Sequence, residues 1–221
     1  MPPLFKKQNR KTLTEIALIN IREALESGQL SPGERIIESK FAKEMEISRF
    51  PIREALRILE QEGLLITEPF KGFRVLSIGI QEIEELMTVR CALEELAIHL
   101  TIKNITSGKI TALENIIKEM KEAVKNNDKE KVLNADLKFH EALCHFSENS
   151  RLIRAWKPLA CQIRICLKME YPLFTTGEDF VETHEPILNA IKKGLGDHAV
   201  KILHRHIYGA LDRIISHFNE S

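Results

Sequence analysis

Apolar residues in the first third of the chain recur with the period of short amphipathic helices. Over Thr12–Ser27 they fall at intervals of three and four residues, and Gly28 is the residue type that commonly ends a helix. The same spacing predicts a second helix over 38–45. Ser48 is a suitable N-cap for a third helix, which ends near Gly63. The pattern therefore predicts three helices, with a tight turn between the last two.

The pattern changes after the third helix. Two short apolar runs, LLIT and FRV, flank the turn EPFKG and predict a β-hairpin. From Gln81 onward every segment has the helical period, and no strand pattern is visible. Helices are predicted at about 81–103, 109–126, 128–147, 150–170, 178–193 and 196–218. The chain is therefore expected to be mainly α, with an N-terminal domain at 1–76, a linker at 77–80 and an all-helical antiparallel bundle at 81–221.

Composition agrees with two small globular domains. Of the 221 residues, 43% are hydrophobic and 29% are charged, and 32 basic residues balance 32 acidic residues. A neutral chain gives no overall sign of a polyanionic partner, so any binding of nucleic acid must depend on a local basic patch.

The cysteines and the first residues indicate a reducing compartment. The four cysteines form no CxxC pair and lie in apolar helical contexts: Cys91, Cys144, Cys161 and Cys166. The N-terminal MPPLFKKQNR lacks the apolar core of a signal peptide, and no run of 18 apolar residues occurs. We therefore expect a cytoplasmic protein without a membrane partner.

A basic stripe follows the third predicted helix. Arg49, Arg53 and Arg57 recur every four residues on the face opposite the apolar positions. A short helix pair whose second helix is basic fits the major groove of DNA, where arginine reads guanine edges and phosphates. The alternative is a solvated face on which Glu54 and Glu60 form ion pairs with these arginines.

The segments GQLSPGERI, SRFPIREAL, LEQEGLL and KGFRV resemble the winged helix-turn-helix of the GntR family of bacterial transcription regulators. The resemblance covers about 65 residues and implies that the N-terminal domain binds double-stranded operator DNA. The implied DNA-binding residues lie in the PG-x-R turn, the start of the recognition helix and the wing tip: Arg35, Ser48, Arg49, Phe50, Arg53, Lys71 and Gly72.

Two positions depart from the family pattern. Glu46 stands where the family usually has a turn glycine, and a left-handed conformation there would cost roughly 1 to 2 kcal/mol. Phe50 replaces a usual small threonine, and its ring could contact a thymine methyl group or merely pack.

In the second domain, Asp136 and His140 are four residues apart on one predicted helix and therefore share a face. Such a pair can bind one metal ion or form an ordinary hydrogen bond on the surface. The spacing alone leaves both interpretations open.

The second domain also resembles the FCD ligand-binding domain of FadR-type GntR regulators. Its features occur in family order: an arginine in MTVRCALEELA, a D-x-x-x-H helix, a histidine in THEPILNAI and a histidine in HRHIYGAL. The resemblance implies a metal site made by Asp136, His140, His184 and His206. Three imidazoles and one carboxylate suit Zn, Ni, Co or Mn and leave open positions for a ligand oxygen.

Two arginines are candidates for binding an anionic effector. The resemblance points to Arg90, because a guanidinium pairs with a carboxylate through two hydrogen bonds. The alternative for Arg90 is a surface salt bridge with Glu94. Arg164 is a weaker candidate of the same kind.

These expectations combine into one functional hypothesis. The chain is expected to be a homodimeric transcription regulator, and not an enzyme, in which a small carboxylate at a metal site modulates operator binding. One alternative is a metalloenzyme that uses the three histidines and the aspartate. Another is a metal sensor in which the ion itself is the effector.

Overall fold

The computed structural model describes residues 12–77, 79–170, 173 and 177–220, and the chain divides into two compact units after Ser77. The N-terminal unit contains three helices and one two-stranded antiparallel sheet. The elements are α1 (Leu13–Ser27), α2 (Glu38–Glu44), α3 (Arg49–Gln61), β1 (Leu65–Glu68) and β2 (Gly72–Val75).

The helix ends in this unit follow from local chemistry. Thr12 accepts a hydrogen bond from the backbone N–H of Glu15, whose carboxylate accepts one in return from the N–H of Thr12. Gly28 ends α1 with a left-handed φ of 79°. In the turn between α2 and α3, Glu46 has a φ of 53°, so the left-handed conformation is kept without a glycine.

One face of α3 forms the core of the N-terminal unit. Its apolar residues Ile52, Leu56 and Leu59 are fully buried, and α3 packs against α1 and α2. The hairpin follows α3, with Leu65 opposite Val75 and Glu68 opposite Gly72. The opposite face of α3 is therefore available to solvent or to a partner.

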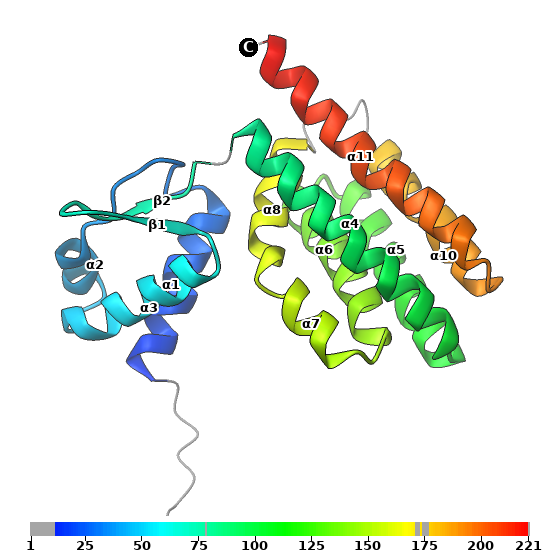
Figure 1. Cartoon of the computed structure of the whole chain (residues 1–221), viewed down its shortest axis with the longest axis horizontal. Helices are drawn as coiled ribbons and strands as arrows, with labels where there is room; N and C mark the ends of the chain where they lie inside the picture. The colour runs from blue at the N-terminus through cyan, green and yellow to red at the C-terminus, as the bar shows by residue number, and fades with distance from the viewer. Residues whose placement is uncertain (1–11, 78, 171–172, 174–176, 221) are drawn as a thin grey trace, which may run out of the picture. The chain divides into compact units, whose positions relative to one another are not determined.

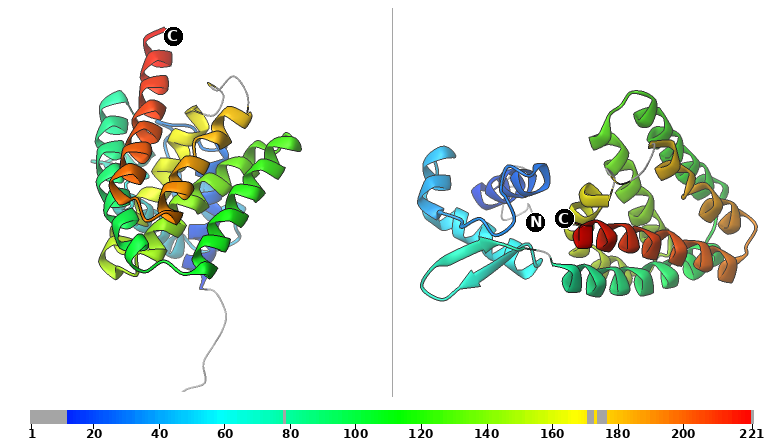
Figure 2. Two further views of the ribbon diagram at one scale, coloured as in Figure 1. Left: turned by 90° about the vertical axis from the view of Figure 1, so that its right-hand side faces the viewer. Right: turned by 90° about the horizontal axis from the view of Figure 1, so that it is seen from above.

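The C-terminal unit is helical throughout the residues that the structure describes. Its elements are α4 (Ile80–Lys103), α5 (Ser107–Lys125), α6 (Lys129–Phe146), α7 (Ser150–Trp156), α8 (Leu159–Glu170), α9 (Gly177–Glu182), α10 (Glu185–Lys192) and α11 (Gly196–Glu220). Helix α4 packs against α6 and α11, while α5 packs against α6 (Figure 1). Figure 2 shows α11 running alongside α4. The predicted fold class, mainly α with a small hairpin wing and a helical C-terminal domain, is confirmed.

Two predicted helices are each broken into two. The predicted helix 150–170 breaks at Pro158, and the predicted helix 178–193 breaks at residues 183–184, just before Pro186. A proline lacks a backbone N–H, so neither Pro158 nor Pro186 can donate the helical hydrogen bond to the carbonyl oxygen four residues earlier, and both breaks have the same physical cause. The second break places His184 at the N-cap of α10, where its side chain makes no capping hydrogen bond and is free to point inward.

Candidate metal centre and nucleic-acid interface

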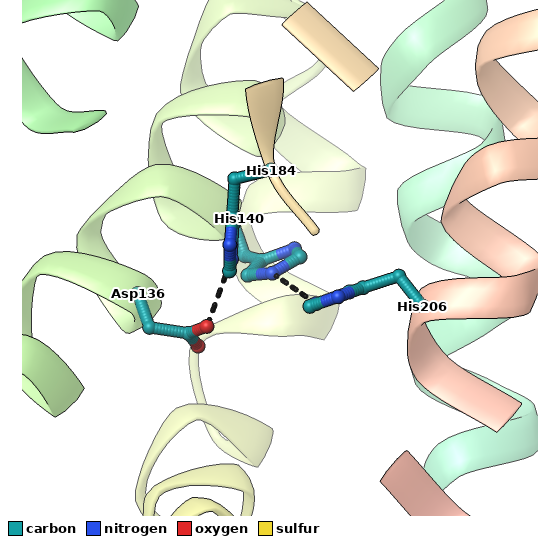
Figure 3. Close-up of side chains that lie close together, drawn as sticks. All are labelled: Asp136, His140, His184 and His206. Atoms are coloured by element: carbon teal, nitrogen blue, oxygen red, sulfur yellow. Dashed lines mark hydrogen bonds and ion pairs between the residues drawn. The ribbon is translucent and has the colours of Figure 1, made fainter. Parts of the chain in front are cut away.

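Four side chains that the FCD resemblance predicts as metal ligands converge inside the helical unit. Asp136 and His140 are one turn apart on α6, His184 precedes α10, and His206 belongs to α11. The first three are fully buried and His206 is 8% exposed. One donor atom from each lies within 4.8 Å of the others, and Figure 3 shows all four side chains directed toward one point.

The contacts within this group leave several polar atoms without hydrogen bonds. Oδ1 of Asp136 lies 2.8 Å from Nε2 of His184, and Nε2 of His140 lies 3.2 Å from Nε2 of His206. Among the described residues, neither oxygen of Asp136 accepts a hydrogen bond and Nε2 of His184 makes none, although these atoms are buried. Burying such groups without partners costs about 1 to 3 kcal/mol each. A shared cation would compensate them, so the donor set fits a metal ion.

Hydrogen bonds outside the group orient two of the imidazoles. Thr183 donates its hydroxyl proton to the carbonyl oxygen of Phe180 at 2.8 Å, so its Oγ1 is free to accept from Nδ1 of His184 at 3.1 Å. In a neutral His184 the proton is therefore on Nδ1, and the lone pair of Nε2 faces Asp136. An acceptor nitrogen this close to a carboxylate oxygen is unfavourable unless a proton or a metal cation lies between them.

Glu94 of α4 orients the imidazole of His140. Its Oε2 lies 2.5 Å from Nδ1 of His140, while its Oε1 accepts hydrogen bonds from Nε of Arg90 at 2.8 Å and from Nε1 of Trp156 at 3.3 Å. Glu94 thus directs the Nε2 lone pair of His140 toward His206. From the sequence, Glu94 is recognisable only as a partner of Arg90, because its contact with α6 depends on how α4 and α6 pack.

Burial and neighbouring charges set the protonation of the group. Burial lowers the pKa of His140, and it lowers the pKa of His206 further with help from the other imidazoles. Burial raises the pKa of Asp136, but His184, His140 and Arg90 outweigh this and hold that pKa below its usual value. Burial likewise raises the pKa of Glu94, but Arg90 and His140 bring it down to about 2. The site therefore offers carboxylate oxygen and unprotonated imidazole nitrogen near neutral pH.

Arg90 lies beside this group and is itself buried. The ion pair with Glu94 that the alternative expected is present, but it is not on the surface, because both side chains are at most 1% exposed. Nη2 of Arg90 is buried without a hydrogen-bond partner, and Nη1 contacts only the sulfur of Met87, at 4.0 Å. A buried guanidinium with unused donors is able to accept a carboxylate.

Arg164 of α8 is 7% exposed and has different neighbours. Its Nη2 donates to Glu130 at 2.6 Å and its Nη1 donates to Asn134, so both contacts are to α6. Its expected role in binding an effector stays a prediction. A partly buried pair joins α8 to α11, where Nη2 of Arg213 donates to Glu170 at 2.6 Å.

The predicted DNA-reading residues lie at the start of α3 and at the wing tip. Ser48 is the N-cap residue of α3, Arg49 is exposed, and the Phe50 ring is 73% exposed, so it does not pack into the core. Lys71 lies in the turn of the hairpin, and Gly72 follows it with a φ of 82° that favours glycine.

Two of the predicted DNA contacts have partners within the protein. Nε of Arg35 donates to the carbonyl oxygen of Lys71 at 2.9 Å and so braces the wing tip. The guanidinium of Arg53 pairs with Glu38 of α2 at 2.7 Å. Glu38 could not be recognised from the sequence, because its contact with α3 depends on how the two helices cross.

Comparison with known proteins identifies both units. Residues 14–75 match the family of bacterial regulatory proteins named gntR, and residues 85–209 match the FCD domain, which covers more than half of the chain. The chain belongs to the GntR family of transcription regulators. The resemblance found in the sequence is confirmed for both domains.

Relatives of this GntR regulator are themselves regulators. It is 30% identical to an uncharacterised HTH-type transcriptional regulator, YdhC, of Bacillus subtilis over 90% of this chain and 84% of the relative. It is also 30% identical to the gluconate operon transcriptional repressor of Bacillus licheniformis over 84% of this chain and 78% of the relative. The prediction of a transcription regulator, in place of a metalloenzyme, is therefore confirmed.

A solved structure shares the fold of this GntR regulator. The structure of Escherichia coli McbR superposes with a TM-score of 0.80 at 23% identity, covering 95% of this chain and all of that one. Within the described ranges, no helix combines the length and the apolar character that crossing a bilayer requires.

Proposed function

We propose that this GntR regulator binds a divalent metal ion through Asp136, His140, His184 and His206, and that a small carboxylate bound beside the ion modulates operator binding. The observation that carries the proposal is the buried carboxylate of Asp136, which accepts no hydrogen bond among the described residues although its Oδ1 lies 2.8 Å from Nε2 of His184. Three imidazoles and one carboxylate suit Zn, Ni, Co or Mn. When bound, such an ion supplies open coordination positions for an oxygen ligand.

Arg90 supports the choice of a carboxylate as the effector. Its positive charge influences Asp136, so it lies within electrostatic range of the proposed metal site. The unused Nη2 donor would bind the end of the carboxylate that the ion does not hold. An effector that binds one dimer state more tightly than the other changes the population of the two states, and with it the affinity for operator DNA.

The N-terminal unit would read DNA through α3 and the wing. One recognition helix covers only a few base pairs, so a specific site requires two copies and a palindromic operator. Exposed apolar side chains on the helical unit support a homodimer. Val89 and Leu96 lie two turns apart on α4 and are 49% and 45% exposed. Tyr208 of α11 contacts Thr88 and is 38% exposed, which extends this apolar strip.

The metal and the effector can be tested together on the full chain. Protein as purified is analysed for bound elements, stripped with a chelator, and reloaded separately with Zn, Ni, Co or Mn. Thermal unfolding is then measured with a series of small carboxylates. We expect one of the ions to raise the unfolding temperature, and at least one acid to raise it further only in the loaded protein.

The same samples distinguish the alternatives. Binding to DNA selected from a random duplex library is measured for stripped protein, loaded protein, and loaded protein with the acid. A change caused by the ion alone would identify a metal sensor. An acid that stabilises stripped and loaded protein equally would overturn the metal-linked effector site.

A further inference from the structure

Arg53 on the exposed face of α3 is held from one side by Glu38, the first residue of α2. Its Nε lies 3.1 Å from both carboxylate oxygens of Glu38, and its Nη2 lies 2.7 Å from Oε2. The Glu38 side chain is 21% exposed, whereas that of Arg53 is 54% exposed. The carboxylate is thus sheltered behind the guanidinium, and the guanidinium faces outward.

The geometry of the pair leaves a defined set of donors. A guanidinium has a side edge, made by Nε and Nη2, and an end edge, made by Nη1 and the second N–H of Nη2. Glu38 occupies the side edge. Among the described residues, none accepts a hydrogen bond from Nη1 of Arg53. The end edge has the spacing that pairs with O6 and N7 of guanine in the major groove.

Stability alone is a weak explanation for this pair. Exposed ion pairs contribute little to folding because solvent screens them and two side chains must be ordered. The neighbouring pair on α3, Arg57 with Glu54, is of that ordinary kind, with a single contact of 3.1 Å between residues three apart. The pair of Arg53 and Glu38 instead joins two helices and fixes the orientation of a guanidinium plane.

We propose that Glu38 is a positioning residue that presents the end edge of Arg53 to a guanine in the operator. This inference rests on the proposed placement of α3 in the major groove. Ordering the guanidinium before DNA binds reduces the rotamer freedom that binding would otherwise remove. The negative charge of Glu38 also weakens the attraction of α3 to DNA phosphates. This effect is the same for every DNA sequence. Glu38 therefore increases discrimination between bases while lowering binding to DNA in general.

The test compares full-length variants on a random duplex library that is selected for binding and then sequenced. The variants are Glu38→Gln, Arg53→Ala and the matched control Glu54→Gln, which removes the same charge from the ordinary pair. Wild type should require guanine at one base pair of each half-site, and Arg53→Ala should lose this preference. Glu38→Gln should reduce the preference at the same base pair by about tenfold. It should bind non-specific duplex as tightly as wild type or more tightly, and Glu54→Gln should keep the preference.

The other possible results for Arg53→Ala and Glu38→Gln distinguish the placement of α3 from the role of Glu38. If Arg53→Ala changes no base preference, the placement of α3 in the groove is wrong, and the inference about Glu38 is overturned with it. If Arg53→Ala loses the preference while Glu38→Gln keeps it, only the inference about Glu38 is overturned. A charge in the first turn of α2 can also stabilise that helix. Thermal unfolding of Glu38→Gln tests this role. If the variant unfolds at a lower temperature and loses binding equally for all sequences, the inference about Glu38 is also overturned.

Discussion

Nδ1 of His140 lies 2.5 Å from Oε2 of Glu94, and both side chains are fully buried. Because Glu94 fixes which nitrogen of His140 faces the proposed ion, we expect Glu94→Gln to lower metal affinity by about 10- to 100-fold. Competition with a chelating dye measures the affinity. Glu95→Gln is the matched control, because Glu95 is the next residue and pairs with the partly exposed His204 at 3.0 Å. Equal affinities for wild type and Glu94→Gln would contradict this role.

His184→Ala removes a proposed ligand without touching α3 or the wing. We expect the variant to contain less metal and to lose its response to carboxylates, while it still binds DNA selected by the wild type. Elemental analysis and calorimetry measure the two properties. A full metal content together with a normal response to the acid would show that His184 is not a ligand.

Arg90→Lys tests the effector site without removing a proposed metal ligand. Lysine keeps the positive charge beside Glu94, which matters because leaving a buried charge unpaired costs about 3 to 5 kcal/mol. It cannot form the planar pair of hydrogen bonds that a guanidinium makes. We expect a normal metal content and an affinity for the acid that is weaker by about 1 to 3 kcal/mol. Calorimetry checks this prediction, and unchanged acid affinity would exclude Arg90 from the effector site.

Glu170 predicts a pH dependence of stability. Burial raises the pKa of Glu170 above its usual value, although Arg213 opposes the shift. A raised pKa means that the stabilising contribution is present below the unfolded value of about 4.5 and is lost as pH rises through the folded value. Relative to wild type, Glu170→Gln should therefore gain unfolding free energy between pH 4 and pH 8, because glutamine does not titrate. Urea unfolding at both values measures the difference, and a relative loss at pH 8 would reverse the assigned sign.

Arg49→Ala tests direct reading of DNA by the recognition helix. Arg49 is exposed at the start of α3, so its removal should weaken binding to selected DNA by about 1 to 3 kcal/mol and leave the fold unchanged. Lys71→Ala should weaken binding to all sequences similarly, because a wing lysine contacts phosphates. Fluorescence anisotropy with selected and scrambled duplexes measures both effects. If Lys71→Ala lost the preference for selected over scrambled DNA while Arg49→Ala kept it, the roles of the two residues would be exchanged.

The order of elements was predictable because helical periodicity and the hairpin turn are local properties of the sequence. The breaks within 150–170 and 178–193 were missed, although Pro158 and Pro186 carried the signal. The four proposed ligands were predictable from the family resemblance and its order of motifs. Their common location depends on how α6, α10 and α11 pack, which periodicity alone does not determine.

Glu94 and Glu38 show what local patterns leave out. Each acts on a residue of another helix, at a separation of 46 residues for His140 and 15 for Arg53. On the sequence, Glu94 resembles any glutamate four residues from an arginine. Burial gives it a different role, because a glutamate at the centre of a bundle must have polar partners.

The proposed ligands come from three separate stretches of chain, on α6, before α10 and on α11. An ion bound by all three would act as a cross-link that closes two long loops, and loop closure reduces the entropy of the unfolded chain. Without the ion, α10 would be held by its packing against α5 and α11, and α11 by its packing against α4, next to buried polar atoms that lack partners among the described residues. Loss of the metal would then make α10 and α11 the first part of the helical domain to open. Hydrogen exchange would detect this opening as faster exchange in α10 and α11 of the metal-free protein.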